Sequence, residues 1–73
     1  MQAYNDKSGN SGISAYEIGS DFIKVKFKFG TYLYTYESAG REAVEQMKNL
    51  AKTGNNLNTF INQHVKNKYA AKM

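Results

Sequence analysis

The sequence predicts an α+β fold, in which a three-stranded antiparallel β-meander is followed by two α-helices packed on one face (β-β-β-α-α). Residues 22–29 alternate strictly between apolar and polar types, which is typical of a half-buried strand. After residue 38 the apolar residues recur at helical spacing, and strands that all precede the helices indicate an α+β layout. The 73 residues allow one domain. We expect a flexible N-terminal lead-in over 1–12, the domain over 13–69 and a short basic tail over 70–73.

The second predicted strand has the clearest signal, F-I-K-V-K-F-K-F from Phe22 to Phe29. One of its faces is apolar and the other is basic, because successive side chains of a strand point to opposite sides. The apolar set is Ile23, Val25, Phe27 and Phe29, and the basic set is Lys24, Lys26 and Lys28. A shorter strand is expected from Ile13 to Ile18, before the turn residues Gly19-Ser20-Asp21, and a third strand from Tyr32 to Tyr36.

The Gly30-Thr31 dipeptide suits a two-residue type II′ hairpin turn, in which glycine takes the first position. This turn sets the register of the last two strands and places the tyrosines on the apolar face. The expected pairs are Phe29 with Tyr32, Phe27 with Tyr34, Val25 with Tyr36, Lys28 with Leu33, Lys26 with Thr35 and Lys24 with Glu37. We therefore expect the tyrosines in the core and at its rim, and not on a binding platform.

Two helices are predicted after the strands. Ser38 can cap a helix from about Ala39 to Ala51, and Gly54 is a suitable stop for it. A second helix is expected from about Leu57 to Lys68. Its apolar stripe is Leu57, Phe60, Ile61, either His64 or Val65, and either Lys68 or Tyr69. His64 would then be a partly buried histidine with a backbone or water partner, with no role in function. The two helices cover one face of the sheet and leave the lysine face in solvent.

The order of these features resembles the KTSC domain, a module found at the C-terminus of some lysyl-tRNA synthetases. The resemblance covers residues 13–69 and is carried by Ile13, I-K-V-K-F (residues 23–27), Gly30, Tyr32, Tyr34, Thr53-Gly54, F-I-N (residues 60–62), Val65 and Tyr69. The chain departs from the family's pattern in lacking proline at the start of the first helix and in a longer loop around Gly54. The resemblance implies a β-meander with two helices and a nucleic-acid-binding function, and it brings no catalytic motif.

The residue inventory argues against catalysis. There is no cysteine and only one histidine, which excludes thiolate nucleophiles, thiolate zinc sites and histidine-rich metal clusters. Glu42 and Glu45 lie three apart on the predicted first helix, where solvated charges are far commoner than an acid–base pair. We predict a protein that is not an enzyme and has no cofactor or metal. It also has no apolar segment of membrane-spanning length and no leader, so we expect a cytoplasmic protein with no membrane partner.

The lysines are the strongest candidates for a binding surface. The net charge is +4, and no acidic residue follows Glu45. The predicted nucleic-acid-binding residues are Lys24, Lys26 and Lys28 on the sheet, with Lys66, Lys68 and Lys72 near the C-terminus. Lysine contacts phosphates without reading bases, so we expect weak, non-sequence-specific binding of RNA or DNA; four lysines on a duplex would make log K fall against log salt with a slope of about −3.6. The alternative is that these lysines only discourage aggregation of a small sheet.

Protein–protein recognition is the second class of function that the sequence supports. The third predicted strand is short, aromatic and nearly uncharged, and it would lie at the edge of the sheet. Its residues Tyr32, Leu33, Tyr34 and Thr35 could pair with a partner strand. Such an edge would serve a homodimer, or a small inhibitor or adaptor that docks onto a larger protein.

Overall fold

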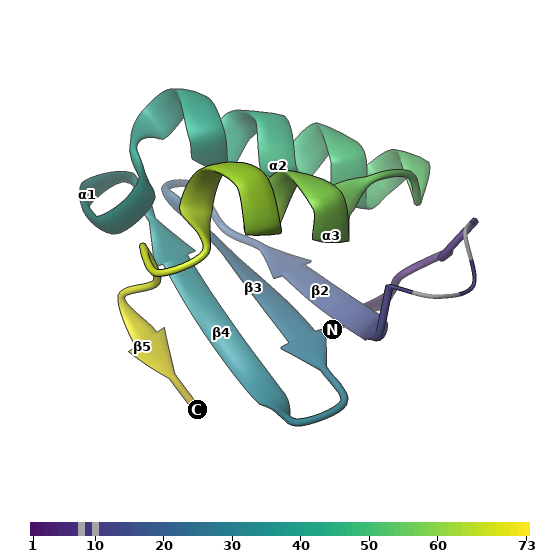
Figure 1. Cartoon of the computed structure of the whole chain (residues 1–73). Coiled ribbons are helices and arrows are strands. Elements are labelled where there is room, and N and C mark those ends of the chain that lie inside the picture. Colours follow the sequence, from purple (N-terminus) through teal and green to yellow (C-terminus); the bar gives the residue numbers. More distant parts are fainter. Residues whose placement is uncertain (8, 10) are drawn as a thin grey trace.

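The computed structural model describes residues 1–7, 9 and 11–73 and contains an antiparallel sheet with helices on one face (Figure 1). Five strands lie in the order β1-β2-β3-β4-β5. They are β1 (Gln2–Ala3), β2 (Ile13–Ile18), β3 (Phe22–Phe27), β4 (Gly30–Thr35) and β5 (Ala71–Lys72). The helices are α1 (Tyr36–Ala39), α2 (Arg41–Thr53) and α3 (Leu57–Phe60), which continues into the π-helical segment η1 (Ile61–Val65). The α+β class is confirmed, whereas the three-stranded layout is corrected to five strands.

Both added strands come from segments that were expected to lie outside the sheet. In β1, Gln2 pairs with Tyr16, and in β5, Lys72 pairs with Tyr32. Tyr4, in the expected lead-in, is only 7% exposed and belongs to the core. Two residues of that lead-in, Ser8 and Asn10, lie outside the described residues. The sequence could not reveal strands of two residues, because two positions are too few to display a period.

The hairpin between β3 and β4 turns at residues 28–29, and not at the predicted Gly30-Thr31. Phe27 therefore pairs with Gly30, and Val25 pairs with Tyr32 where Tyr36 was expected. Each β3 residue meets a partner four positions earlier than predicted. Because four is an even number, the apolar and basic faces of both strands are as predicted even though every pair is different.

The start of α1 explains this shift of register. Thr35 caps α1 with its side-chain oxygen, which accepts from the Ser38 backbone N–H at 3.0 Å, while the Ser38 hydroxyl oxygen accepts from the Thr35 N–H at 3.0 Å. This reciprocal capping box ends β4 at Thr35, so Tyr36 is helical and cannot pair with Val25. Gly40, at φ 93°, then separates α1 from α2, so the single predicted helix from Ala39 is wrong at its start. Its predicted stop at Gly54 is confirmed.

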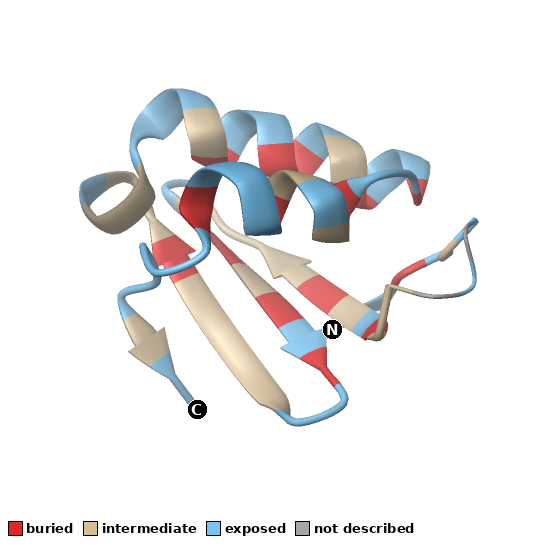
Figure 2. Ribbon diagram, in the orientation of Figure 1, coloured by how far each residue is buried: buried red, intermediate tan, exposed pale blue. Residues whose placement is uncertain are grey.

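The core lies between the apolar face of the sheet and the helices. Figure 2 shows that buried positions recur along β2, β3 and β4 and along the helices above them. The strands contribute Ile23, Val25, Phe27, Tyr34, Ile13 and Tyr16, and the helices contribute Val44, Met47, Ala51, Leu57, Ile61 and Val65. No helix covers the opposite face of the described sheet, where Lys26 is exposed.

Gly54 joins the N-terminal segment to the helices. It ends α2 in the left-handed region at φ 75°, and its carbonyl accepts from the Lys7 N–H at 2.9 Å. A Cβ at this position would collide with the Asn5 carbonyl oxygen. Tyr4 joins the same two regions, because its hydroxyl oxygen accepts from the Leu57 N–H at 3.4 Å. Only glycine combines this backbone conformation with so close an approach.

Candidate functional site

The basic stripe on the open face of the sheet is shorter than predicted. Lys24 and Lys26 lie on this face of β3, but Lys28 belongs to the turn. The Lys24 ammonium lies 3.8 Å from the Glu17 carboxylate, on the neighbouring strand, and 5.8 Å from the centre of the Phe22 ring. The stripe is therefore reduced to two lysines, one of which is paired with an acid.

The three C-terminal lysines do not join that stripe. Lys72 pairs with Tyr32 in the sheet, and its ammonium lies 5.5 Å from the Tyr32 ring and 5.9 Å from the Phe29 ring. Tyr32 lies across from Val25, so Lys72 is on the helix side of the sheet. Lys66 and Lys68 follow η1 and are exposed. The predicted lysines therefore do not share one face, because Lys24 and Lys26 lie on the open face and Lys72 lies on the helix side.

A groove of about 450 Å³ opens on the helix side, and we call it the aromatic groove. It runs between the β3–β4 hairpin, the end of the helical layer and the segment that leads into β5. Its lining residues are Ser11, Phe27, Phe29, Tyr32, Tyr34, Asn58, Ile61, Asn62, Lys66, Asn67 and Tyr69. Five of these residues are aromatic, and in the described lining there is no carboxylate.

The rings of the aromatic groove are ordered by contacts with one another. Phe29 stacks on Phe27 with 5.5 Å between ring centres, yet 68% of Phe29 remains exposed. Tyr69 is 39% exposed and meets Tyr32 edge-on at 4.8 Å. Tyr34 forms the floor, where burial, followed by the neighbouring Tyr32 and Tyr69, raises its pKa to about 12. Two exposed rings therefore stand over a buried aromatic layer that holds them in place.

The shifted hairpin register is the reason that sequence reasoning missed this groove. With the predicted turn, Phe29 would pair with Tyr32 inside the strand, whereas in the structure it projects from the turn. Tyr69 was one of two candidates for the last position of the second helix's apolar stripe, but the helical segment ends at Val65. The one signal that could have indicated the site is Tyr69 itself, an aromatic residue in an otherwise polar N-K-Y segment beside lysines.

The predicted protein-binding edge, Tyr32 to Thr35, is covered by β5 over its first two residues. Tyr32 and Leu33 of β4 pair with Lys72 and Ala71 of β5, and Tyr34 is only 1% exposed. The edges of the described sheet are instead β1 and β5, each of two residues. Edge strands this short provide few backbone groups for another strand. Homodimerisation through a strand edge stays a prediction.

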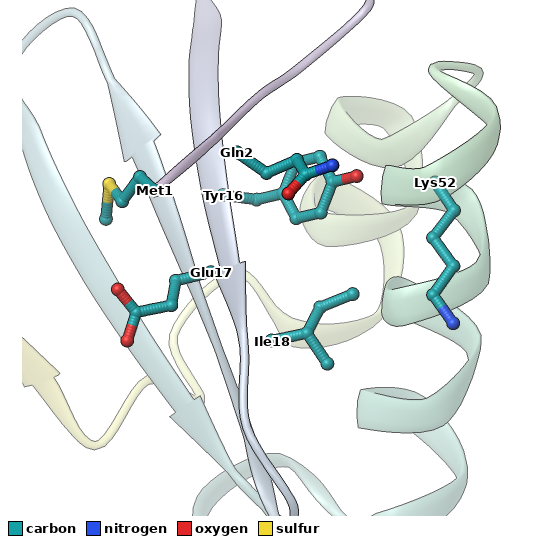
Figure 3. A pocket seen from close by; sticks show the side chains of 6 residues that line it. All are labelled: Met1, Gln2, Tyr16, Glu17, Ile18 and Lys52. Atoms are coloured by element: carbon teal, nitrogen blue, oxygen red, sulfur yellow. The ribbon is translucent and has the colours of Figure 1, made fainter.

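A second hollow of about 590 Å³ lies where β1 and β2 meet α2, and is lined by Met1, Gln2, Tyr16, Glu17, Ile18 and Lys52. Figure 3 shows Tyr16 and Ile18 directed toward the helix and Glu17 directed away from it. Its one aromatic ring, Tyr16, is buried, and its lining carries both an acid and a base. This hollow has neither exposed rings nor charge of one sign.

Glu45 and His64 are the remaining polar candidates from the sequence, and Glu45 takes part in contacts that hold the fold together. Glu45 accepts hydrogen bonds from the Tyr36 hydroxyl and from Lys48, at 2.7 Å, and these two bonds lower the pKa of Glu45, with Lys48 the larger cause. Lys48 also donates to the Ser20 carbonyl at 3.1 Å, which ties α2 to the β2–β3 turn. His64 is exposed, with its ring 4.6 Å from that of Phe60, so the prediction of a partly buried histidine is wrong.

Metal-binding clusters and membrane-spanning helices are both absent from the described part of the chain. Among its residues, no three histidine, cysteine or carboxylate side chains come together in a way that could hold a metal ion. No helix in the described part of the chain has the length and apolar character needed to cross a bilayer.

Comparisons with known proteins give no match to this chain. No protein-family model matches it, and no curated protein and no solved structure is significantly similar to it. The resemblance to the KTSC domain family therefore stays a prediction. What the chain does has to be inferred from the aromatic groove and its surrounding charges.

Proposed function

We propose that this chain is a non-catalytic module that binds single-stranded nucleic acid in the aromatic groove. The observation that carries the proposal is the combination of exposed rings with lysines in a lining without carboxylates. Sequence-tolerant single-strand binding uses the same combination, in which bases stack on aromatic side chains and a positive groove follows the backbone.

Phe29 and Tyr69 are the proposed stacking residues. Both rings are large and exposed. Phe29 is held on one face by Phe27, and Tyr69 is held by its edge-on contact with Tyr32. A base that stacks on them adds apolar contact without requiring the protein to order a loose side chain. Bases in a duplex are already stacked on one another, so their faces are not available to these rings. Single strands are therefore the better ligand.

Lys66 and Lys72 are the proposed phosphate contacts. Lys66 lines the groove, and Lys72 lies above two of its rings. Neither forms an ion pair within the described residues. Two such contacts with a single strand would give a slope of about −1.4 for log K against log salt. Lys24 and Lys26, on the other side of the sheet, would add only long-range attraction.

The test compares two phenylalanine variants by fluorescence anisotropy with a labelled single-stranded oligonucleotide at low salt. Phe29→Leu keeps apolar bulk but removes the exposed ring, and stacking is worth roughly 1–3 kcal/mol per base, so affinity should fall by at least about fivefold. Phe22→Leu makes the same change on the open face and should leave affinity unchanged. Thermal melts of both variants check that the fold is retained.

Several outcomes would contradict the proposal. Wild-type protein that shows no salt-sensitive retention of RNA or DNA single strands at low salt would rule it out. Equal losses in the two phenylalanine variants would show that binding does not use the aromatic groove. Tighter binding of a duplex than of its separate strands would argue against stacking as the source of affinity.

A further inference from the structure

We propose that the Tyr34 hydroxyl forms a hydrogen bond with one base of the bound strand at the floor of the aromatic groove. The inference rests on the proposed function and adds a polar contact with the base to the stacking and phosphate contacts. It is carried by a hydroxyl that has no partner among the described residues, although the side chain that bears it is almost completely buried.

The Tyr34 hydroxyl opens into the groove. Tyr34 is 1% exposed, and no described residue forms a hydrogen bond with its hydroxyl. In the described part of the chain, every completely buried side-chain oxygen or nitrogen has a hydrogen-bond partner. The Tyr34 oxygen is therefore reached by solvent, and the opening through which solvent reaches it is the groove that Tyr34 lines. A ligand in the groove can meet this oxygen in the same way.

Other tyrosines of the chain use their hydroxyls within the protein. The Tyr4 hydroxyl accepts from the Leu57 N–H, and the Tyr36 hydroxyl donates to Glu45. A buried tyrosine usually finds such a partner, because a polar group that leaves water without one loses free energy. Tyr34 has instead an aromatic hollow beside it, so the missing partner is expected to come from the ligand.

The Tyr69 ring sets the orientation of a base above Tyr34. Tyr69 is one of the two proposed stacking residues, its ring centre lies 6.5 Å from that of Tyr34, and the two ring planes are at 90°. A base that stacks on Tyr69 is parallel to that ring, so it cannot stack on Tyr34 as well and meets it edge-on. The groove volume of about 450 Å³ lies in the range of roughly 300–1,000 Å³ that is typical of small-ligand sites. There is thus room for one base above the floor.

A base suits the floor better than a phosphate does. Burial raises the pKa of Tyr34 to about 12, so at neutral pH the phenol keeps its proton and can donate as well as accept. A base is flat and uncharged, and the edges of an unpaired base carry groups that complete such a bond. A phosphate at the same depth would lose the hydration of its charge, which is far more costly. The exposed Lys66 and Lys72 remain for the phosphates.

The contact favours no particular base, because a hydroxyl that both donates and accepts can bond to the edge of any of them. The inference therefore keeps the expectation of sequence-tolerant binding. It changes the depth of the site, since one base has to reach the floor of the groove and not only its two exposed rings.

The experiment measures anisotropy at low salt and neutral pH with two labelled strands of equal length. One is oligothymidine, and the other is its analogue built from difluorotoluene, a nonpolar ring that has the shape of thymine and stacks but forms no strong hydrogen bond. Tyr34→Phe should weaken binding of oligothymidine by about fivefold, a modest loss because water bonds to the hydroxyl in the free protein. Binding of the analogue should change by less than about twofold.

Tyr16→Phe is the matched control. Tyr16 is also buried and its hydroxyl also lacks a partner among the described residues, but it lines the separate hollow beside α2. This variant should bind both strands as the wild type does. Thermal melts of the two variants at neutral pH check that each keeps the fold.

The outcomes separate this inference from the proposed function. If Tyr34→Phe binds oligothymidine as tightly as the wild type, or loses as much affinity for the analogue as for oligothymidine, the hydroxyl does not bond to a base and the inference is overturned while the proposed function stands. An equal loss for oligothymidine in Tyr16→Phe would also overturn it. If the wild type binds neither strand, the proposed function and the inference both fail.

Discussion

The two sides of the sheet use the same residue types in different arrangements. On the open face, Lys24 lies over Phe22 but is also 3.8 Å from Glu17. On the helix side, Lys72 lies over Phe29 and Tyr32, and no ion pair neutralises it within the described residues. A lysine beside a ring is therefore not sufficient evidence of a site. The difference lies in whether the charge is free and whether the ring has a hollow beside it.

A regular lysine pattern on a strand is a poor guide to function. The alternation of Lys24 and Lys26 follows from the solvent exposure of one strand face. The aromatic groove has no such period, because its residues come from the hairpin turn, the helical layer and the segment before β5. We therefore expect perturbations of the groove to act on binding and matched perturbations of the open face to act weakly.

Charge reversal should have the largest effect. In the double variant Lys66→Glu/Lys72→Glu, single-strand affinity should fall by about 100-fold at low salt, because two phosphate contacts become repulsions. The matched double variant Lys24→Glu/Lys26→Glu changes the net charge equally and should lose less than about tenfold, since only long-range attraction is affected. Anisotropy titrations at several salt concentrations measure both. Equal losses would show that net charge alone, and not the groove, controls binding.

Alkaline pH should have a smaller effect, for which the measured quantity is the stability of the fold and not binding. Burial raises the pKa of Tyr34 to about 12 from its ordinary value of 10.0, so the folded state keeps this proton when the unfolded state has lost it. Stability should therefore fall as pH rises through the window from about 10 to about 12, with no dependence from this group below it. Tyr34→Phe should flatten that decline in urea melts at pH 9, 10 and 11. A wild-type stability that stays constant over this range would contradict the expected burial of the groove floor.

The smallest effect should come from the ion pair on the open face. Glu17→Gln removes the partner of Lys24, which is a surface contact worth about 0–1 kcal/mol. Stability should change by less than about 0.5 kcal/mol, and single-strand affinity should rise by less than about twofold. Urea melts and anisotropy titrations measure the two quantities. A gain of tenfold or more would mean that the open face, once freed of its acid, is a binding surface in its own right.

Several elements were predictable from local patterns. The alternation over Phe22–Phe29 identified β3 and its two faces, although β3 ends at Phe27, and Gly54 marked the end of α2. Leu57 began the last helical segment as predicted. Each of these signals depends on residues close together in the chain. The two-residue strands β1 and β5 have no such signal, because only their partners in the sheet make them strands.

The candidate site was less predictable than the fold. Lys66 and Lys72 were named as binding residues from the sequence, but they were assigned to the same surface as Lys24 and Lys26. Phe29 was placed in the core and is the most exposed ring of the groove. The asparagines that also line the groove were not singled out from the sequence, because scattered polar residues have no distinguishing pattern; they are Asn58, Asn62 and Asn67.

The sequence by itself determined which residues of each strand share a face, whereas the tertiary structure decided which residues lie opposite one another. The physical reason is that side chains alternate with a period of two, so a displacement by four residues leaves every face unchanged. The choice between the two registers depended on the capping box of Thr35 and Ser38, which ends β4 before Tyr36. That choice moved the turn to residues 28–29, released Phe29 from the sheet and so produced the aromatic groove.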